Sequence, residues 1–161
     1  APSPAFRLSL RNVTNANILN YLTQERKLSP SLVNFFIAAG DIYEDAAHHN
    51  VVFVGRDADG HPRYASSRGI NEKFRQDAAG AEKAFGFAHR GTDKQLLVFE
   101  APIDLLSFIE LFPKTGSSTI ICRWAGCRAR HCGSFFLNAR TWSGCSSVWM
   151  PTRLERMPAS G

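Results

Sequence analysis

The sequence KQLLVFEAPIDLLS, residues 94–107, contains the clearest change from a strand pattern to a helix pattern in the chain. The run KQLLVFE has the length and apolar character of a buried strand, and it ends in Glu100. A helical pattern follows from Pro102 to Leu111, and proline suits a first helical turn because the N–H that it lacks would have no partner there. Because ligands bind at the carboxyl ends of strands in open α/β sheets, Glu100 is a candidate site residue. Asp104, in the first turn of the helix, either supports that site or complements the helix dipole.

The residues before this segment also show helix and strand patterns. Ser29 and Pro30 form a helix start, with serine as the N-cap, and Gly40 can adopt the left-handed conformation that ends a helix. An Asp-Gly turn between two β-rich runs indicates a hairpin. We predict helices at 15–24, 29–40 and 102–111, hairpin strands at 51–56 and 62–67, a shorter strand at 84–89 and a buried strand at 94–100. The predicted fold class is α+β or α/β: N-terminal helices and a β-hairpin, followed by the first strand–helix unit of a truncated α/β domain.

Length and composition restrict the class of protein. The chain has 161 residues, of which 44% are hydrophobic and 20% charged, and this suits one globular domain, or one and a half, with a buried core. No apolar run reaches the roughly 18–20 residues of a membrane span, and no basic, apolar leader opens the chain. We therefore expect a cytoplasmic protein with no membrane partner. Because the chain begins at Ala1 rather than methionine, we expect it to be a piece of a longer protein.

The positive charge is concentrated at the C-terminal end. Residues 1–114 carry 13 basic and 13 acidic side chains, whereas residues 115–161 carry six arginines and one acid, so the formal charge of +5 lies entirely in the second segment. All four cysteines, all three tryptophans and both methionines also lie there. The basic excess therefore says nothing about the partners of the first 114 residues.

Several stretches of the chain resemble a known family. VFEAPIDLLS (98–107) resembles the first motif of Toprim domains, the fold shared by bacterial primases, topoisomerases and related nucleases. YEDAAHHNVVFVGRD (43–57), PRYASSRG (62–69) and FRQDAAGAEK (74–83) resemble the uncharacterised domain that precedes the Toprim unit in primase-like proteins of bacterial plasmids and integrative elements. The resemblance implies three segments: a primase-associated domain of helices and hairpin over 1–92, the start of a Toprim-like domain over 93–114, and a tail of a different kind over 115–161.

The resemblance implies a mechanism as well as a fold. In Toprim domains a glutamate matching Glu100 takes part in acid–base chemistry on a phosphoester or helps to place a metal, and a D-x-D motif on a later strand binds Mg²⁺. The D-x-D of this chain, Asp57-Ala-Asp59, precedes Glu100 and is followed by Gly60, which is the signature of a hairpin turn. The sequence contains no aspartate after residue 114. The Mg²⁺ site that the family implies is therefore incomplete, and we predict no intact metal site.

The tail has two interpretations. The first is a zinc module, but the cysteine spacing C-x4-C-x4-C-x12-C differs from that of paired zinc ligands, and a disulfide framework is disfavoured without an export signal. The ligands of such a module would be Cys122, Cys127, Cys132 and Cys145, with His131. The second interpretation is a shifted reading frame, which we favour.

The shifted-frame hypothesis can be examined with the genetic code. If each codon starts at the third base of one residue's codon, residues 114–161 can spell a continuation of a Toprim domain, including a strand LFVCL followed by DAD. Trp149 and Met150 have single codons, so the shifted frame must spell aspartate and then alanine there. On this hypothesis the tail has no native-like packing. The strand that ends at Glu100 would then lose its native sheet neighbours, and residues 96–99 would seek a substitute partner or expose an aggregation-prone edge.

The predicted hairpin carries candidate nucleic-acid contacts. Arg63 and Arg68 lie on or just after its second strand with Tyr64 between them, a pattern that suits phosphates and an aromatic platform for a base, and equally a solvated strand face. The basic side of the hairpin continues with Lys73, Arg75 and Lys83.

Two functions fit these features. The first is a fragment of a primase-like, Mg²⁺-dependent Toprim enzyme that acts on DNA in the replication or mobilisation of plasmids or integrative elements, with an RNA primer or nucleotides as further partners. Without the metal half we expect no turnover. The second is a noncatalytic nucleic-acid-binding module whose arginines contact phosphates. Primase, nuclease and topoisomerase-like chemistry are all compatible with the resemblance, because one fold serves many functions.

Overall fold

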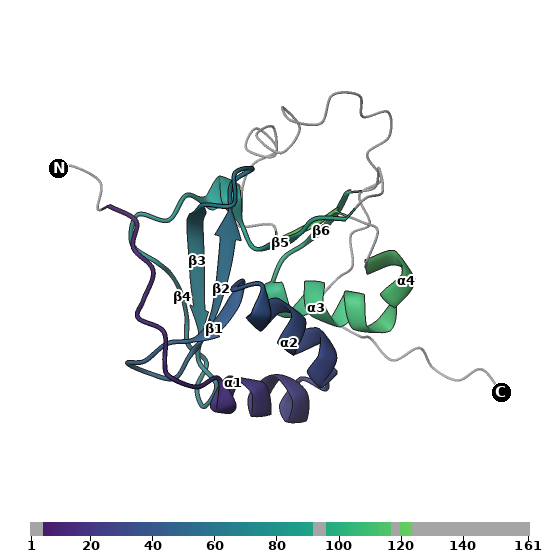
Figure 1. The fold of residues 1–161 in the computed structure, drawn as a ribbon, viewed down its shortest axis with the longest axis horizontal. Helices are drawn as coiled ribbons and strands as arrows, with labels where there is room; N and C mark the ends of the chain where they lie inside the picture. Colours follow the sequence, from purple (N-terminus) through teal and green to yellow (C-terminus); the bar gives the residue numbers. More distant parts are fainter. Residues whose placement is uncertain (1–4, 92–95, 117–119, 124–161) are drawn as a thin grey trace.

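The computed structural model contains two β-sheets with helices packed beside them (Figure 1). It describes residues 5–91, 96–116 and 120–123. The elements in chain order are α1 (Ala16–Asn20), η1 (Tyr21–Glu25), α2 (Pro30–Ala38), β1 (Ile42–Glu44), β2 (Val51–Arg56), β3 (Pro62–Arg68), β4 (Arg75–Asp77), η2 (Lys83–Phe85), β5 (Ala88–His89), β6 (Leu96–Phe99), α3 (Pro102–Leu111), α4 (Pro113–Gly116) and β7 (Ile120–Arg123). This combination of helices with a largely antiparallel set of strands confirms the predicted α+β fold class.

The first sheet is antiparallel, with the strand order β1-β2-β3-β4. Its strand β2 is buried on both faces. Val51 and Phe53 belong to the larger hydrophobic core, whereas Val52 and Val54 belong to a smaller cluster that the N-terminal segment covers. Burial on both faces explains why VVFV is a continuous apolar run instead of an alternating one. The predicted hairpin of β2 and β3 is confirmed.

The second sheet has the order β5-β7-β6, with β7 parallel to β6 and antiparallel to β5. On the shifted-frame hypothesis, the strand ending at Glu100 loses its native sheet neighbours and either takes a substitute partner or exposes its edge. Residues 120–123 of β7 pair with residues 96–99 of β6, so this edge is paired and the exposed-edge alternative is wrong. Ile120 and Ile121 are β-branched and favour a strand even in a segment of unusual composition. Residues 124–161, for which the same hypothesis predicts an absence of native-like packing, lie outside the described residues.

The helices begin and end close to the predicted residues. α2 starts after Ser29, whose Oγ accepts a hydrogen bond from the Leu32 amide at 3.4 Å. Gly40 follows this helix with a φ of +75°, a left-handed conformation in which most side chains would be strained. α3 has the predicted bounds, Pro102–Leu111. The helix predicted at 15–24 is present as α1, continued by the π-helical turn η1.

The strand predicted at 84–89 is only partly present. The turn η2 occupies the start of this segment, and β5 contains only Ala88 and His89. The backbone of Phe85 and Gly86 packs directly against Gly55 of β2 in this region.

One hydrophobic core joins the helices to both sheets, with side chains from α1, η1, α2, β1, β2, β6 and α3. Glu110 of α3 fixes the contact with α2, because its carboxylate accepts hydrogen bonds from the Ser29 backbone N–H at 2.9 Å and from the Ser29 hydroxyl at 2.8 Å. The domain boundary predicted after residue 92 stays a prediction. Strand β5, which precedes this boundary, pairs with β7, which follows it. In the described part of the chain, no helix is both long and apolar enough to cross a membrane.

Candidate functional site

Two carboxylates lie where β6 ends and α3 begins. Glu100 directly follows β6 and is exposed, and Asp104 lies in the first turn of α3, where its amide donates to the Ala101 carbonyl. Burial raises the pKa of the Asp104 carboxyl; the positive charge of Arg68 opposes this rise, the negative charge of Glu100 adds to it, and Arg75 also opposes it. The two predicted carboxylates are therefore close enough to interact electrostatically, beside two arginines.

The two arginines come from the first sheet. Arg68 ends β3, and its partner across the strand pair is Arg75 of β4. The Arg75 side chain donates a hydrogen bond to the Glu100 backbone carbonyl at 3.4 Å, which ties this corner of the first sheet to the end of β6. We call Arg68, Arg75, Glu100 and Asp104 the mixed-charge site. It combines two guanidinium groups with two carboxylates where the two sheets meet.

Arg68 also contacts a tyrosine that no sequence pattern indicates. Its Nε donates to the Tyr21 hydroxyl oxygen at 3.2 Å, and the Nε of Arg26 donates to the same oxygen at 2.8 Å. The Arg26 guanidinium lies over the Tyr21 ring, 5.2 Å from the ring centroid. Tyr21 and Arg68 are 47 residues apart in the sequence, so only the folded chain brings them together.

Two of the residues predicted to contact nucleic acid interact with other side chains of this chain. Tyr64 is fully buried and its hydroxyl donates a hydrogen bond to Asp77, so its ring has no free face for a base. Arg63 forms an ion pair with Glu82 at 2.9 Å, and its guanidinium lies over the Phe85 ring. On β3, Tyr64 is buried whereas its neighbour Arg63 is exposed.

The remaining predicted contacts differ in their surroundings. Lys83 lies 3.7 Å from the Asp77 carboxylate, whereas Lys73 is exposed between β3 and β4. Of the predicted residues, Arg68 comes together with Glu100 and Asp104, and Arg63 lies toward the other end of β3.

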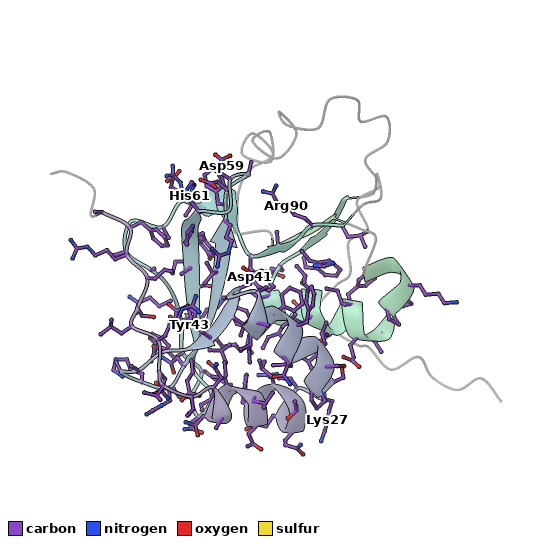
Figure 2. All side chains as sticks on the ribbon, in the orientation of Figure 1. Lys27, Asp41, Tyr43, Asp59, His61 and Arg90 are labelled. Atoms are coloured by element: carbon purple, nitrogen blue, oxygen red, sulfur yellow. The ribbon has the colours of Figure 1, made fainter. Side chains whose placement is uncertain are left out.

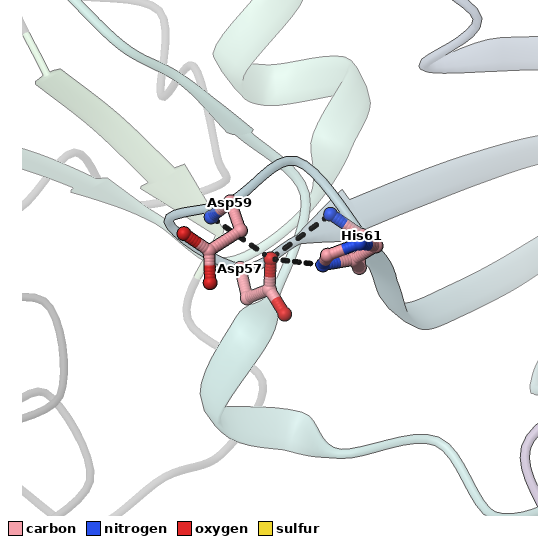
Figure 3. A group of neighbouring side chains, drawn as sticks. All are labelled: Asp57, Asp59 and His61. Carbon is pink, nitrogen blue, oxygen red and sulfur yellow. Dashed lines mark hydrogen bonds and ion pairs between the residues drawn. The ribbon is translucent and has the colours of Figure 1, made fainter.

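Asp57, Asp59 and His61 form a compact group in the turn between β2 and β3 (Figure 3). The Oδ1 of Asp57 accepts hydrogen bonds from the backbone N–H groups of Asp59 at 3.0 Å and His61 at 2.9 Å. Desolvation acts to raise the pKa of the Asp57 carboxyl, but these bonds outweigh it and lower the pKa. Such bonds define an Asx turn, which supports the interpretation of the D-x-D as a hairpin turn. Figure 2 shows Asp59 and His61 at the end of the first sheet that is distant from Lys27 and the first helices.

The described residues do not assemble a Mg²⁺ site around Glu100. Within residues 5–91, 96–116 and 120–123, the turn group is the only set of three metal-ligating side chains that lie close together. The mixed-charge site offers two carboxylates, but its two guanidinium groups would repel a cation. As described, this site suits a phosphate anion better than a divalent metal ion.

Part of the chain matches a known family. Residues 20–93 match DUF3991, which is described as a protein of unknown function. A search of the curated proteins finds no match.

Comparison with solved structures finds a likeness in fold. A chain in the structure of bacteriophage T7 lagging-strand DNA polymerase with primase domains bound to an RNA/DNA hybrid and dTTP has a TM-score of 0.55 and 20% identity, and the match covers 77% of this chain and 63% of that one. The primase fragment of the bacteriophage T7 primase-helicase protein gives a TM-score of 0.47 and 21% identity, and the match covers 74% of this chain and 50% of that one. The DnaG primase catalytic domain bound to ssDNA gives a TM-score of 0.46 and 14% identity, and the match covers 73% of this chain and 51% of that one.

This chain has a primase-like fold. The likeness with a TM-score of 0.55 supports the statement, and at 20% identity it concerns the fold alone. The chain spans between half and 63% of the length of these three structures.

Proposed function

We propose that this chain is part of a primase-like protein that acts on DNA, and that the mixed-charge site binds phosphate groups of the nucleic acid. The observation that carries the proposal is the meeting of Arg68 and Arg75 with Glu100 and Asp104 at the carboxyl end of β6. This is the edge at which open α/β sheets bind their ligands. The RNA/DNA hybrid and dTTP in the bacteriophage T7 structure support nucleic acid as the ligand.

Each charged group has its own role in this proposal. The guanidinium groups of Arg68 and Arg75 bind phosphate oxygens and neutralise their charge. Glu100 is exposed, and in the intact enzyme it would act as acid or base on the phosphoester. Because burial raises the pKa of Asp104, this side chain keeps its proton to a higher pH than an ordinary aspartate, and so repels a bound phosphate less.

The Toprim resemblance supports a more specific form of the proposal. In this form the intact protein is an Mg²⁺-dependent enzyme in the replication or mobilisation of plasmids or integrative elements. The metal would be held by carboxylate oxygens and substrate phosphates, and would supply charge neutralisation. On the shifted-frame hypothesis, the second half of that site can be spelled only in the other frame after residue 114. We therefore propose that the chain as it stands binds nucleic acid without turnover.

Arg68→Ala and Arg75→Ala test phosphate binding by the mixed-charge site. In a fluorescence-anisotropy titration with labelled single-stranded DNA, each change is expected to weaken binding about tenfold and to lower the salt dependence by about one phosphate contact. Arg63→Ala is the matched control, because Arg63 lies on the same strand as Arg68 but is paired with Glu82. Equal weakening by Arg63→Ala, or no weakening by Arg68→Ala, would contradict the proposed site.

The nucleotide sequence across Lys114 tests the catalytic part of the proposal. If one added base restores the D-A-D reading, the frame-restored protein is expected to need Mg²⁺ for polynucleotide synthesis or cleavage. Glu100→Gln is then expected to lower the rate by about a hundredfold or more, because the amide cannot transfer a proton. The lack of a three-ligand metal group near Glu100 among the described residues favours the noncatalytic module as the second candidate. A frame-restored protein that binds Mg²⁺ no better than this chain would leave that module as the function.

A further inference from the structure

Tyr21 and Arg26 lie outside the mixed-charge site and form a cluster with one of its residues, Arg68. The Tyr21 hydroxyl oxygen accepts one hydrogen bond from the Nε of Arg26 at 2.8 Å and another from the Nε of Arg68 at 3.2 Å. Because both donors contact one oxygen, the two Nε atoms lie within about 6 Å of each other. Two like charges at this distance repel each other unless an anion compensates them.

No acidic side chain forms an ion pair with either guanidinium within the part of the chain that the structure describes. Asp104 interacts with the charge of Arg68 at longer range only. Arg26 is exposed and Arg68 is half-buried, so an anion from solution can reach the guanidinium groups.

The Tyr21 hydroxyl hydrogen also lacks an acceptor among the described residues. A hydroxyl oxygen has two lone pairs and one hydrogen, and the two arginines occupy both lone pairs. The hydrogen is therefore left to donate, although Tyr21 is only 3% exposed. Both hydrogen bonds to the oxygen are only partly buried, so a group from solution can accept this hydrogen. A tetrahedral oxyanion can do so, since its oxygens can accept from the hydroxyl and from both guanidinium groups at once.

We propose that Tyr21, Arg26 and Arg68 bind one phosphate group, with Tyr21 as the positioning residue that holds both guanidinium groups in place. Arg68 belongs to the mixed-charge site as well, so a nucleic acid bound there would bring a neighbouring phosphate to this cluster. In this respect the inference rests on the proposed function. The phosphate comes from a phosphodiester chain or from a free triphosphate, and the experiment separates the two sources.

The experiment uses the full chain with two probes: labelled single-stranded DNA, followed by fluorescence anisotropy, and ATP, followed by calorimetry. Tyr21→Phe keeps the ring and removes the hydroxyl, and Arg26→Gln removes one exposed guanidinium. Each is expected to weaken binding of one probe about tenfold, and the probe that is affected identifies the source of the phosphate. Arg26→Lys restores the charge without the planar fork and is expected not to recover the affinity.

Lys27→Gln is the matched control, because it removes the same charge at the next position of the chain. Lys27 is exposed and lies at the end of the first helical segment (Figure 2). It makes no contact with the Tyr21 hydroxyl, so its substitution is expected to change the affinity for either probe less than twofold.

The outcomes separate the cluster from the proposed function. If the parent chain binds neither probe, both proposals fail. If the parent binds DNA and Arg75→Ala weakens it, but Arg26→Gln and Tyr21→Phe change neither probe, only the phosphate cluster fails. If Tyr21→Phe lowers the Tm, the Arg26→Gln variant decides the question. Weaker binding by Arg26→Gln at an unchanged Tm supports the cluster, and unchanged binding by Arg26→Gln overturns it.

Discussion

At the scale of single residues, Glu44 shows how this fold stabilises a buried charge. It is fully buried, and its oxygens accept hydrogen bonds from the side chains of Asn12, Asn17 and His49 at 2.7 to 2.8 Å. The backbone N–H groups of Asn17 and Ile18, at the start of α1, also donate to it. Burial alone would raise the pKa of Glu44, but these bonds outweigh it and lower the pKa. Glu44 therefore anchors the first helix to β1.

Glu44→Gln is expected to lower the free energy of unfolding by about 3 kcal/mol at neutral pH. The new NH₂ group would face the donors of Asn17 and His49, and the negative charge at the start of α1 would be lost. Because the folded pKa of Glu44 is depressed, the stability from its charge is present above the unfolded pKa and is lost as the pH falls through the folded pKa.

Urea unfolding of the parent and Glu44→Gln at neutral pH and at about pH 3 checks this expectation. The difference in stability between the two should shrink at the acidic pH. Glu25→Gln is the control, because Glu25 is exposed on η1. A similar loss from Glu25→Gln, or a difference independent of pH, would contradict the role of the buried charge.

Only part of the candidate site could be predicted at this scale. Glu100 follows a clear strand, Asp104 lies in a first helical turn, and Arg68 lies on a recognisable hairpin. These positions carry local signals. Tyr21 and Arg26 carry none, because their contact with Arg68 forms only when η1 packs against the end of β3. A hydrogen bond between distant residues has no period or spacing that a single sequence can show.

At the scale of elements, the crossing of the η2–β5 segment over β2 depends on Gly55. A Cβ at this position would collide with the Phe85 carbonyl oxygen and with the backbone of Gly86. The pairing of β2 with β3 also shifts its register directly after Gly55. The chain can therefore pass from the first sheet to the second only because this strand has no side chain here.

Gly55→Ala is expected to destabilise the fold by about 3 kcal/mol, because the atoms in its way are backbone and cannot rotate aside. Gly60→Ala provides the comparison. Gly60 has open space around it but a φ of +84°, so alanine there should cost only about 1 kcal/mol of backbone strain. Thermal or urea unfolding of both variants measures the two costs. If Gly60→Ala were the more damaging, the close approach of the two backbones could not be the reason for glycine at position 55.

Elements with local signals could be predicted, and elements that depend on a distant partner could not. α2 and α3 each begin with proline in the first turn, and Ser29 caps α2, so their starts are visible in the sequence. β1 and β4 have three residues each and are strands only because they pair with β2 and β3. A segment of three residues is too short to show a strand period, so the four-stranded sheet was predicted only as its central hairpin.

At the scale of the whole molecule, β7 holds the second sheet together. β5 and β6 do not pair with each other, and each of them pairs with β7 in the described part of the chain. Without β7, the strand that carries Glu100 at its end would expose its backbone N–H and C=O groups to solvent or to other chains. The position of the mixed-charge site therefore depends on residues 120–123, which lie in the segment of unusual composition.

Shortening the chain tests this dependence. A chain that ends after Arg123 keeps β7, whereas a chain that ends after Gly116 loses it. Amide hydrogen exchange in residues 96–99 is expected to be at least about tenfold faster in the shorter chain, since a tenfold change corresponds to about 1.4 kcal/mol of lost protection. Exchange in β2 and β3 should be equal in the two chains, because these strands pair only within the first sheet.

The same comparison bears on the shifted frame. Equal protection of β6 in the two shortened chains would mean that residues 120–123 do not support it, as the shifted-frame hypothesis predicts for a non-native tail. Faster exchange in the shorter chain would mean that the residues as they stand form β7, whichever frame is the original one. Measured on the frame-restored protein, the exchange of β6 would then show whether the restored residues form a better neighbour. Greater protection in the restored protein is the expected result, because its sequence also spells the further strand LFVCL that a Toprim-like sheet would contain.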